Sequence, residues 1–130
     1  MTVFVDTSAL YALLDADDDG HDRAVRGRDA IGDDNLVTHG YVVAETISLV
    51  RRRLGAAAAV RVIDELLPAL DIVDVEGELR EAATRAFRAA VRSSVSFVDH
   101  TSFVFMRDKK IVRAWALDAD FATAGFDVVA

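Results

Sequence analysis

The sequence predicts an α/β fold in which helices cover both faces of a mainly parallel sheet. Short apolar runs rich in β-branched and aromatic residues alternate with longer segments of helical period throughout the chain. Such alternation is typical of strand–helix–strand units, in which consecutive strands run parallel. The 130 residues, 52% of them hydrophobic and one of them proline, suit a single domain that spans residues 1–130.

The first part of the chain alternates regularly between short strands and helices. The predicted strands are residues 2–5 and 35–39, and the predicted helices are residues 7–14, 21–31 and 40–54. Thr7 or Ser8 can cap the amino end of the first helix. In the third helix, apolar residues such as Val43 and Ile47 recur at helical spacing, and Gly55 is suited to end it.

The second part of the chain continues the same alternation. The predicted helices are residues 56–70, residues 78–91 and a segment that begins after Ser96, and the predicted strands are residues 71–75, 110–117 and 126–129. Pro68 is expected to break the last turn of the first of these helices, because proline lacks a backbone N–H. Ser96 and Asp99 form the S-x-x-D pattern that is typical of a helix start.

Acidic residues stand where the predicted strands end and helices begin. Asp6 and Asp118 each directly follow a strand, and Asp99 lies in the first turn of the helix after Ser96. Glu45 lies one to two turns into the helix at residues 40–54. Because ligands bind outside the carboxyl ends of the strands in an open parallel sheet, we expect these four carboxylates to meet at one edge of the sheet.

A divalent cation would relieve the repulsion among such carboxylates, because each one disfavours the charge of the others. The chain has no cysteine, so oxygen atoms are the natural ligands, and these suit Mg²⁺ or Mn²⁺. The net charge of −7 argues against binding of a nucleic-acid backbone through a basic surface alone, but a cation held by acids can bind phosphate. Metal-assisted hydrolysis of a phosphodiester bond is the favoured chemistry.

Each acid also has an ordinary structural interpretation when it is taken singly. Glu45 on a helix can simply face water, and Asp99 can be the capping-box partner of Ser96. Asp6 and Asp118 can be turn-forming residues at strand ends. The prediction of an acidic site therefore depends on the joint pattern.

Four segments resemble, in the same order, the four motifs of the PIN-domain ribonucleases. They are VDTSALYALL, THGYVVAETISLVRRRLG, SFVDHTSFVFM and ALDADFATAGFDVV. The resemblance extends over nearly the whole chain and is closest to the VapC-like toxins of bacterial and archaeal toxin–antitoxin pairs. It implies a three-layer α/β/α sandwich, Mg²⁺- or Mn²⁺-dependent endoribonuclease activity on RNA, a homodimer, and inhibition by a cognate antitoxin.

The motifs also imply which residues act. The metal-binding and catalytic acids carried over by the resemblance are Asp6, Glu45, Asp99 and Asp118. Ser8 is expected to form a hydrogen bond within the site, and a secondary role is open for Asp120.

A second acidic segment, LLDADDDGHD at residues 13–22, has a structural interpretation. Asp15, Asp17 and Asp19 match the first half of a calcium-binding EF-hand loop, but Arg26 stands where the bidentate glutamate is needed. Runs of like charge usually face water, so we expect a solvated loop that ends the preceding helix.

The histidines, the tryptophan and the arginines also have structural interpretations. His21 and His39 are expected in loops or caps, and Trp115 in the core. His100 is next to Asp99, but neighbouring helix residues face different directions, so its direct involvement is disfavoured. Two groups of arginines are expected to face solvent, with binding of RNA phosphates or of acidic antitoxin side chains as the alternative. They are Arg51, Arg52 and Arg53, and Arg85, Arg88 and Arg92.

Other functions remain open beside the toxin. A PIN-fold nuclease that processes RNA outside a toxin–antitoxin pair, and a non-catalytic module that only binds a partner or RNA, would share this fold. Aspartate-phosphorylating phosphatases need a second aspartate where this chain has Ser8, and receivers need a lysine where it has Asp118. The amino terminus has no basic leader and no long apolar run, so a cytosolic protein without a membrane span is expected.

Overall fold

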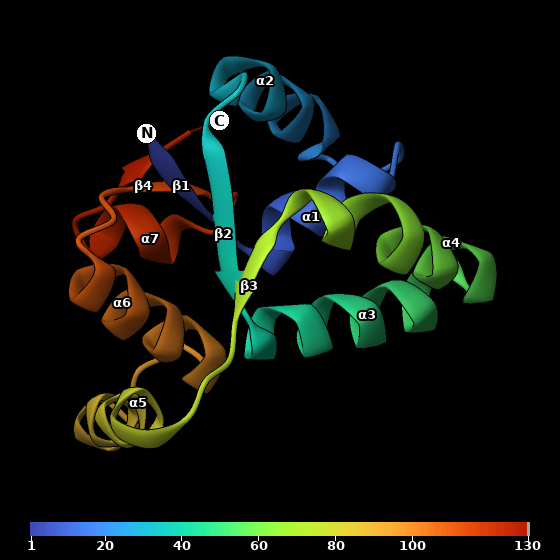
Figure 1. Cartoon of the computed structure of the whole chain (residues 1–130). Coiled ribbons are helices and arrows are strands. Elements are labelled where there is room, and N and C mark those ends of the chain that lie inside the picture. The colour runs from blue at the N-terminus through green and yellow to red at the C-terminus, as the bar shows by residue number, and fades with distance from the viewer. Residues whose placement is uncertain (130) are drawn as a thin grey trace.

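A five-stranded parallel sheet lies at the centre of the computed structural model, which describes residues 1–129, and helices flank both of its faces (Figure 1). The strands are β1 (Thr2–Val5), β2 (Asn35–His39), β3 (Asp71–Val73), β4 (Arg113–Trp115) and β5 (Asp127–Val128), in the order β3-β2-β1-β4-β5. The α-helices are α1 (Thr7–Leu14), α2 (His21–Ile31), α3 (Gly40–Leu54), α4 (Ala56–Arg61), α5 (Gly77–Ala89), α6 (Phe97–Lys109) and α7 (Ala119–Thr123). The predicted three-layer α/β/α fold is confirmed.

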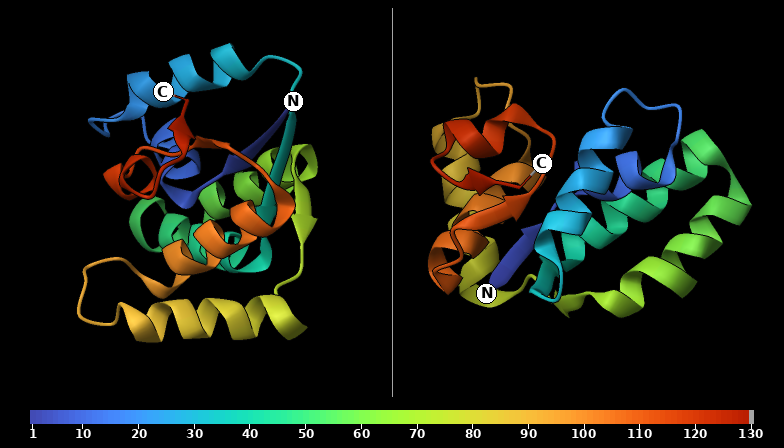
Figure 2. Two further views of the ribbon diagram at one scale, coloured as in Figure 1. Left: turned by 90° about the vertical axis from the view of Figure 1, so that its left-hand side faces the viewer. Right: turned by 90° about the horizontal axis from the view of Figure 1, so that it is seen from above.

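The central strand β1 supplies apolar side chains to the cores on both faces of the sheet. Val3 and Val5 pack with α1 and α2 on one face, whereas Phe4 packs with α6 and α7 on the other. This division follows from the strand, because successive side chains point to opposite faces. The helix α5 lies outside α6 and covers it (Figure 2). Burial of apolar side chains on both faces holds the three layers together.

The register of the sheet brings the carboxyl ends of three strands to one edge. Phe4 of β1 pairs with Val37 of β2 and with Ala114 of β4. Just beyond the strand, the backbone N–H of Asp6 donates to the carbonyl oxygen of Trp115 (3.1 Å). The chain therefore leaves β1, β2 and β4 at the same edge, where α1, α3 and α7 begin.

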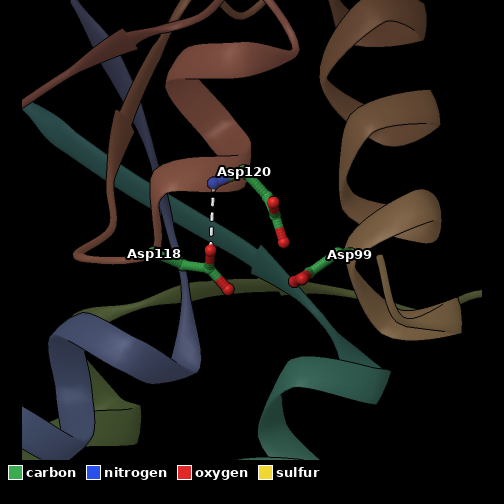
Figure 3. A group of neighbouring side chains, drawn as sticks. All are labelled: Asp99, Asp118 and Asp120. Atoms are coloured by element: carbon green, nitrogen blue, oxygen red, sulfur yellow. Dashed lines mark hydrogen bonds between the residues drawn. The ribbon is translucent and has the colours of Figure 1, made fainter. Parts of the chain in front are cut away.

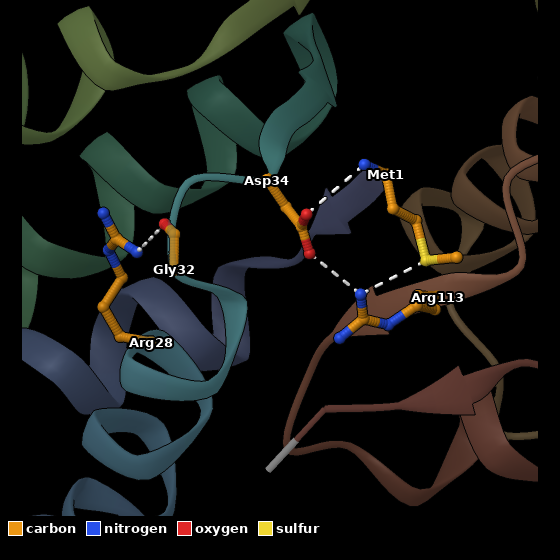
Figure 4. Close-up of polar contacts among 5 residues, drawn as sticks. All are labelled: Met1, Arg28, Gly32, Asp34 and Arg113. Carbon is orange, nitrogen blue, oxygen red and sulfur yellow. Dashed lines mark hydrogen bonds and ion pairs between the residues drawn. The ribbon is translucent and has the colours of Figure 1, made fainter.

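Ion pairs join the amino ends of the strands at the opposite edge (Figure 4). Asp34, just before β2, contacts the N-terminal amine of Met1 (3.3 Å) and Nη1 of Arg113 in β4 (2.9 Å). The hydrogen bond from the amine is the main reason why the pKa of Asp34 lies below its usual value. Arg28 of α2 donates to the carbonyl oxygen of Gly32 (3.2 Å) and so closes the turn that leads to β2.

The predicted helix at residues 56–70 is not uniform. The helix α4 ends at Arg61 and is followed by a π-helical turn, η1 (Val62–Leu66), and a 3₁₀ turn, η2 (Leu67–Ala69). Pro68 lies in η2 and cannot donate to the carbonyl four residues earlier, so the hydrogen-bond pattern must change near it. The expected helix and the break in its last turn at Pro68 are confirmed, but after Arg61 the helix is π-helical and 3₁₀ rather than α-helical.

Three predicted strands are shorter than expected, and one helix end differs. The segment 126–129 forms a strand only at Asp127–Val128. The segment 71–75 forms a strand only at Asp71–Val73, and the segment 110–117 only at Arg113–Trp115. The strand β4 ends before Leu117, whose N–H donates to Ser8 Oγ (2.9 Å) instead of to a neighbouring strand. The predicted arginine face is also shorter, because α5 ends at Ala89 and Arg92 lies beyond it.

Gly27 of α2 lies where no side chain fits. A Cβ atom there would lie 2.7 Å from the carbonyl oxygen of Val129 and 2.8 Å from Cδ1 of the buried Trp115 ring. We expect Gly27→Ala to lower the free energy of unfolding by about 1–3 kcal/mol, although alanine favours helix formation, because this overpacking strains the core. Urea denaturation measures the change. Gly40→Ala is the control, since nothing lies within 4 Å of a Cβ at Gly40; equal midpoints for the two variants would contradict the packing argument.

Candidate active site

A cavity of about 470 Å³ lies at the edge where β1, β2 and β4 end. Five carboxylates line it, namely Asp6, Glu45, Asp99, Asp118 and Asp120. They come from the end of β1, from α3, from α6 and from the start of α7. The structure thus brings the four acids singled out in the sequence into one cavity and adds Asp120 to them.

Asp6 follows β1 directly and caps α1. Its Oδ2 accepts hydrogen bonds from the backbone N–H (3.1 Å) and the hydroxyl (2.6 Å) of Ser8. The expected hydrogen bond of Ser8 within the site is therefore confirmed. The cap is Asp6 rather than the predicted Thr7 or Ser8, because Asp6 has the extended backbone that lets a side chain reach back to the first N–H groups of a helix. The Oδ1 of Asp6 is buried without a hydrogen-bond partner within residues 1–129.

Asp99, Asp118 and Asp120 form the tightest part of the acidic cluster (Figure 3). One carboxylate oxygen from each lies within 4.8 Å of the other two. Asp118 caps α7, and its Oδ1 accepts from the backbone N–H of Asp120 (2.9 Å). Asp99 lies in the first turn of α6, where Ser96 Oγ accepts from its backbone N–H (3.0 Å). The backbone thus helps to orient these acids before any ligand arrives.

Glu45 reaches the cavity from the second turn of α3. The buried hydroxyl of Thr46 donates to Thr7 Oγ1 (3.1 Å), and the Thr7 hydroxyl donates to the carbonyl oxygen of Val42 (3.4 Å). These contacts dock the start of α3 against the start of α1. Glu45 is half-buried and lines the cavity, although it lies outside the group of three oxygen atoms described above.

Burial and the charges of neighbouring acids raise the pKa values of three acids in the cavity, Asp6, Asp99 and Asp120. Burial is the main reason why the pKa of Asp6 rises to about 6 and that of Asp99 to about 7. The negative charges of the neighbouring acids add to both shifts. The charge of Asp118 raises the pKa of Asp120 as well. A positive charge placed among these acids would be favourable, since it would remove the cause of their repulsion.

The side chains in the cavity fit a hard divalent cation. Within residues 1–129, those that line it offer carboxylate and hydroxyl oxygens and no histidine nitrogen or cysteine sulfur. The buried Oδ1 of Asp6, which lacks a partner in this part of the chain, is an atom that a cation or a proton is expected to satisfy. Mg²⁺ and Mn²⁺ bind to carboxylate oxygens of this kind and keep several water ligands.

The histidines and the tryptophan have structural roles, as expected from the sequence. His39 caps α3, and its Nε2 lies 2.9 Å from the hydroxyl oxygen of Ser102. His100 packs edge-on against the rings of Phe87 and Phe103 and does not line the cavity. Trp115 is buried in the core between the sheet and α1 and α2.

The acidic loop after α1 is held by its own hydrogen bonds. Asp15 Oδ1 accepts from the N–H of Asp17 (3.0 Å), and Asp18 Oδ2 accepts from the N–H of Gly20 (2.9 Å). The loop ends α1, as predicted, and its most exposed acids face water. Within residues 1–129, the group of acids close enough to share one ion is the one at the sheet edge and not this loop.

The sequence did not predict the helix α7, although it left a secondary role in the site open for Asp120. The short helix that Asp118 caps turns Asp120 towards Asp99 (Figure 3). The sequence did contain a signal for this helix, because an aspartate that can cap a helix is followed by helix-forming residues and then by Gly125. In the structure Gly125 has a φ of 100°, which suits a chain reversal after a helix. Arg52, two helical turns after Glu45 on α3, also lines the cavity.

The fold and the acidic cavity correspond to a known class of protein. The family model of the PIN domain matches residues 3–127, so the chain belongs to the PIN-domain family. Within that family it is similar to the 23S rRNA-specific endonuclease VapC20 of Mycobacterium tuberculosis, with 39% identity over 95% of both chains. The identification as a VapC-like PIN-domain endoribonuclease is thereby confirmed.

Solved structures agree with this assignment. The crystal structure of Mycobacterium tuberculosis VapC20, described as a sarcin–ricin loop cleaving toxin, matches with a TM-score of 0.85 at 38% identity over 95% of both chains. The crystal structure of FitAcB from Neisseria gonorrhoeae matches with a TM-score of 0.74 over 100% of this chain and 97% of that one, and at 16% identity it supports the fold alone. No helix in the described part, residues 1–129, is long and apolar enough to cross a membrane.

The hydroxyl of Ser8 links Asp6 to the chain after β4, so its removal tests how far the site is preorganised. We expect Ser8→Ala to lower the affinity for Mn²⁺ and the kcat of cleavage by about tenfold each, because Asp6 loses a hydrogen bond and the N–H of Leu117 loses its acceptor. Calorimetric titration and single-turnover kinetics measure the two effects. Ser93→Ala is the matched control, since Ser93 is exposed and its hydroxyl oxygen accepts from the nearby N–H of Val95, away from the carboxylates. Equal behaviour of both variants would contradict a positioning role.

Proposed function

We propose that this chain is a divalent-cation-dependent endoribonuclease that cuts large-subunit ribosomal RNA at the sarcin–ricin loop. The observation that carries the chemistry is the meeting of five carboxylates in one cavity, where one oxygen of Asp6 is buried without a hydrogen-bond partner within residues 1–129. The substrate is supported by the 39% identity to a 23S rRNA-specific endonuclease. It is further supported by the TM-score of 0.85 with a sarcin–ricin loop cleaving toxin.

In this proposal Asp6, Glu45, Asp99 and Asp118 hold the cation, which is Mg²⁺ with Mn²⁺ as a substitute. Asp120 assists them, because one of its carboxylate oxygens lies within 4.8 Å of those of Asp99 and Asp118. When bound, such a cation neutralises phosphate oxygens and lowers the pKa of a water that attacks the phosphodiester. The protein supplies the preorganised carboxylates, so little reorganisation is needed when RNA arrives.

The proposal is tested by incubating the purified full-length chain with an RNA hairpin of the sarcin–ricin sequence. We expect one cut in the presence of Mg²⁺ or Mn²⁺, none in EDTA, and recovery when the cation is restored. A hairpin of the same composition with a scrambled loop is the control for specificity. Cleavage that continues unchanged in EDTA would overturn the proposed mechanism.

The wider biological role is part of the same proposal. We propose that residues 1–130 form a single cytosolic domain that assembles as a homodimer and is inhibited by a cognate antitoxin. The support is the likeness to VapC20, described as a toxin, over 95% of the chain. Induced expression is expected to stop growth, and co-expression of a short neighbouring gene for the antitoxin is expected to restore it. Unchanged growth would favour an RNA-processing nuclease or a binding module instead.

A further inference from the structure

A second cavity, of about 460 Å³, lies beside the acidic cavity and carries two arginines. Ser8, Leu49 and Asp118 line both cavities, so the two adjoin each other. Arg23 from α2 and Arg53 from α3 line the second cavity. Basic side chains from two separate helices thus border the site where the acids meet.

Both guanidinium groups are available to an anion. They are exposed, and within residues 1–129 neither has a carboxylate oxygen within 4.0 Å. Two acids line the same cavity. Asp18 uses its Oδ2 to accept from the N–H of Gly20, and Asp118 uses its Oδ1 to cap α7. Within residues 1–129, neither of these acids forms an ion pair with Arg23 or Arg53.

An aromatic ring holds Arg53 in place. Its Cζ lies 5.4 Å from the centroid of the Tyr11 ring, over its face. Tyr11 is 8% exposed, and its hydroxyl donates to Asp15 (2.7 Å), so the ring itself is held firmly. Because Tyr11 follows Ser8 by three residues on α1, the two side chains share a face of that helix. Tyr11, Ser8 and Arg53 line the second cavity together, so the ring favours a position of the Arg53 guanidinium at this cavity.

The helix dipole favours a cation at the position of Arg53 but not at that of Arg23. Arg53 lies in the last turn of α3, where the helix dipole favours a cation. Arg23 is in the first turn of α2, which begins at His21, and there the positive end of the dipole disfavours a cation. An anion in the cavity that Arg23 lines would offset this cost.

We infer that Arg23 and Arg53 form a subsite for a backbone phosphate of the RNA, beside the phosphate that is cut at the acidic cluster. The inference rests on the proposed function. Since the net charge of the chain is −7, its overall field repels RNA, and local unpaired guanidinium groups must contact the backbone instead. Guanidinium groups suit this task because they bind phosphate oxygens in a bidentate manner. Such a subsite would determine the direction in which the strand crosses the cavity.

The first test is the kinetics of an R23Q/R53Q double variant on the sarcin–ricin hairpin with Mg²⁺. We expect KM to rise by about tenfold, kcat to stay within about twofold, and the salt dependence of kcat/KM to lose about one to two units of slope. The matched control is Arg26→Gln, on α2. Its side chain is exposed and lies outside the two cavities, so this variant should match the wild type. Equal thermal midpoints verify folding.

The second test locates the phosphate. Single phosphates on either side of the cut are replaced, one at a time, by uncharged methylphosphonates. At one position we expect the replacement to raise the KM of the wild type by about tenfold and to leave the KM of the double variant unchanged, because the same contact has already been removed. Additive effects at every position would overturn the subsite.

The remaining outcomes separate this inference from the proposed function. If the wild-type chain leaves the RNA intact, both the proposed function and the subsite are refuted. If the wild type cleaves the RNA and the double variant has the same KM as the control, the subsite alone is refuted. Normal RNA kinetics combined with loss of inhibition by the antitoxin would also overturn it, since the arginines would then bind an acidic protein segment.

Discussion

Asp6→Asn is expected to reduce RNA cleavage by at least about 1000-fold while the protein stays folded. Asp6 is 3% exposed, and its Oδ1 is buried without a hydrogen-bond partner within residues 1–129. The amide keeps the size of the side chain and can still accept from Ser8. It removes the negative charge, however, and with it the attraction for a cation at the end of β1. Calorimetric titration with Mn²⁺ should show the loss of affinity independently of activity.

The matched control for this substitution is Asp17→Asn in the acidic loop. Asp17 is exposed and lies outside the acidic cavity, so the same change of charge should leave cleavage unchanged. Single-turnover kinetics at saturating Mg²⁺ separates the chemical step from binding. An Asp6→Asn variant that cleaves within about tenfold of the wild-type rate would show that Asp6 does not hold the cation.

Local patterns were sufficient to predict most of the acidic site, because strand ends and helix starts leave clear signals in the sequence. The buried run before Asp6 has to be a strand, and the S-x-x-D pattern places Asp99 in a first helical turn. Parallel strands end at one edge, so the acids that follow them must meet there. Glu45 was less clear from local pattern, because a single glutamate on a helix can simply face water, and the second motif of the PIN-domain resemblance supported its choice.

The features that the sequence did not predict depend on contacts between distant segments. The helix α7 has only five residues, too few for a period to be recognised, and its turn places Asp120 in the cluster. Arg23 and Arg53 lie on different helices, and nothing in the spacing of these residues shows that they line one cavity. Charge alone suggested that Arg53 faces solvent. The neighbouring cavity and the ring of Tyr11 give it a more specific environment.

Asp99→Asn is expected to stabilise the cation-free protein at pH above about 7, and to abolish the stabilisation that Mg²⁺ gives to the wild type. The pKa of Asp99 rises from 3.8 to about 7 in the folded protein, mainly through burial. Between these values the folded carboxyl keeps a proton that the unfolded chain releases, so the wild type loses stability as the pH rises. The asparagine variant has no such loss, and the difference should reach about 2–4 kcal/mol above pH 7.

His39 contributes to the pH dependence in the opposite sense. Burial lowers its pKa from 6.5 to about 4, so between these values the unfolded chain binds a proton that the folded protein excludes, and stability rises with pH. Both proteins carry His39, so the difference between wild type and Asp99→Asn, measured by urea denaturation at each pH, isolates Asp99. With Mg²⁺ the wild type should gain stability and the variant should not, because the cation takes the place of the proton that the crowded carboxylates otherwise retain. A wild type that gains stability between pH 4 and 7 relative to the variant would mean that burial and the neighbouring acids do not raise the pKa of Asp99.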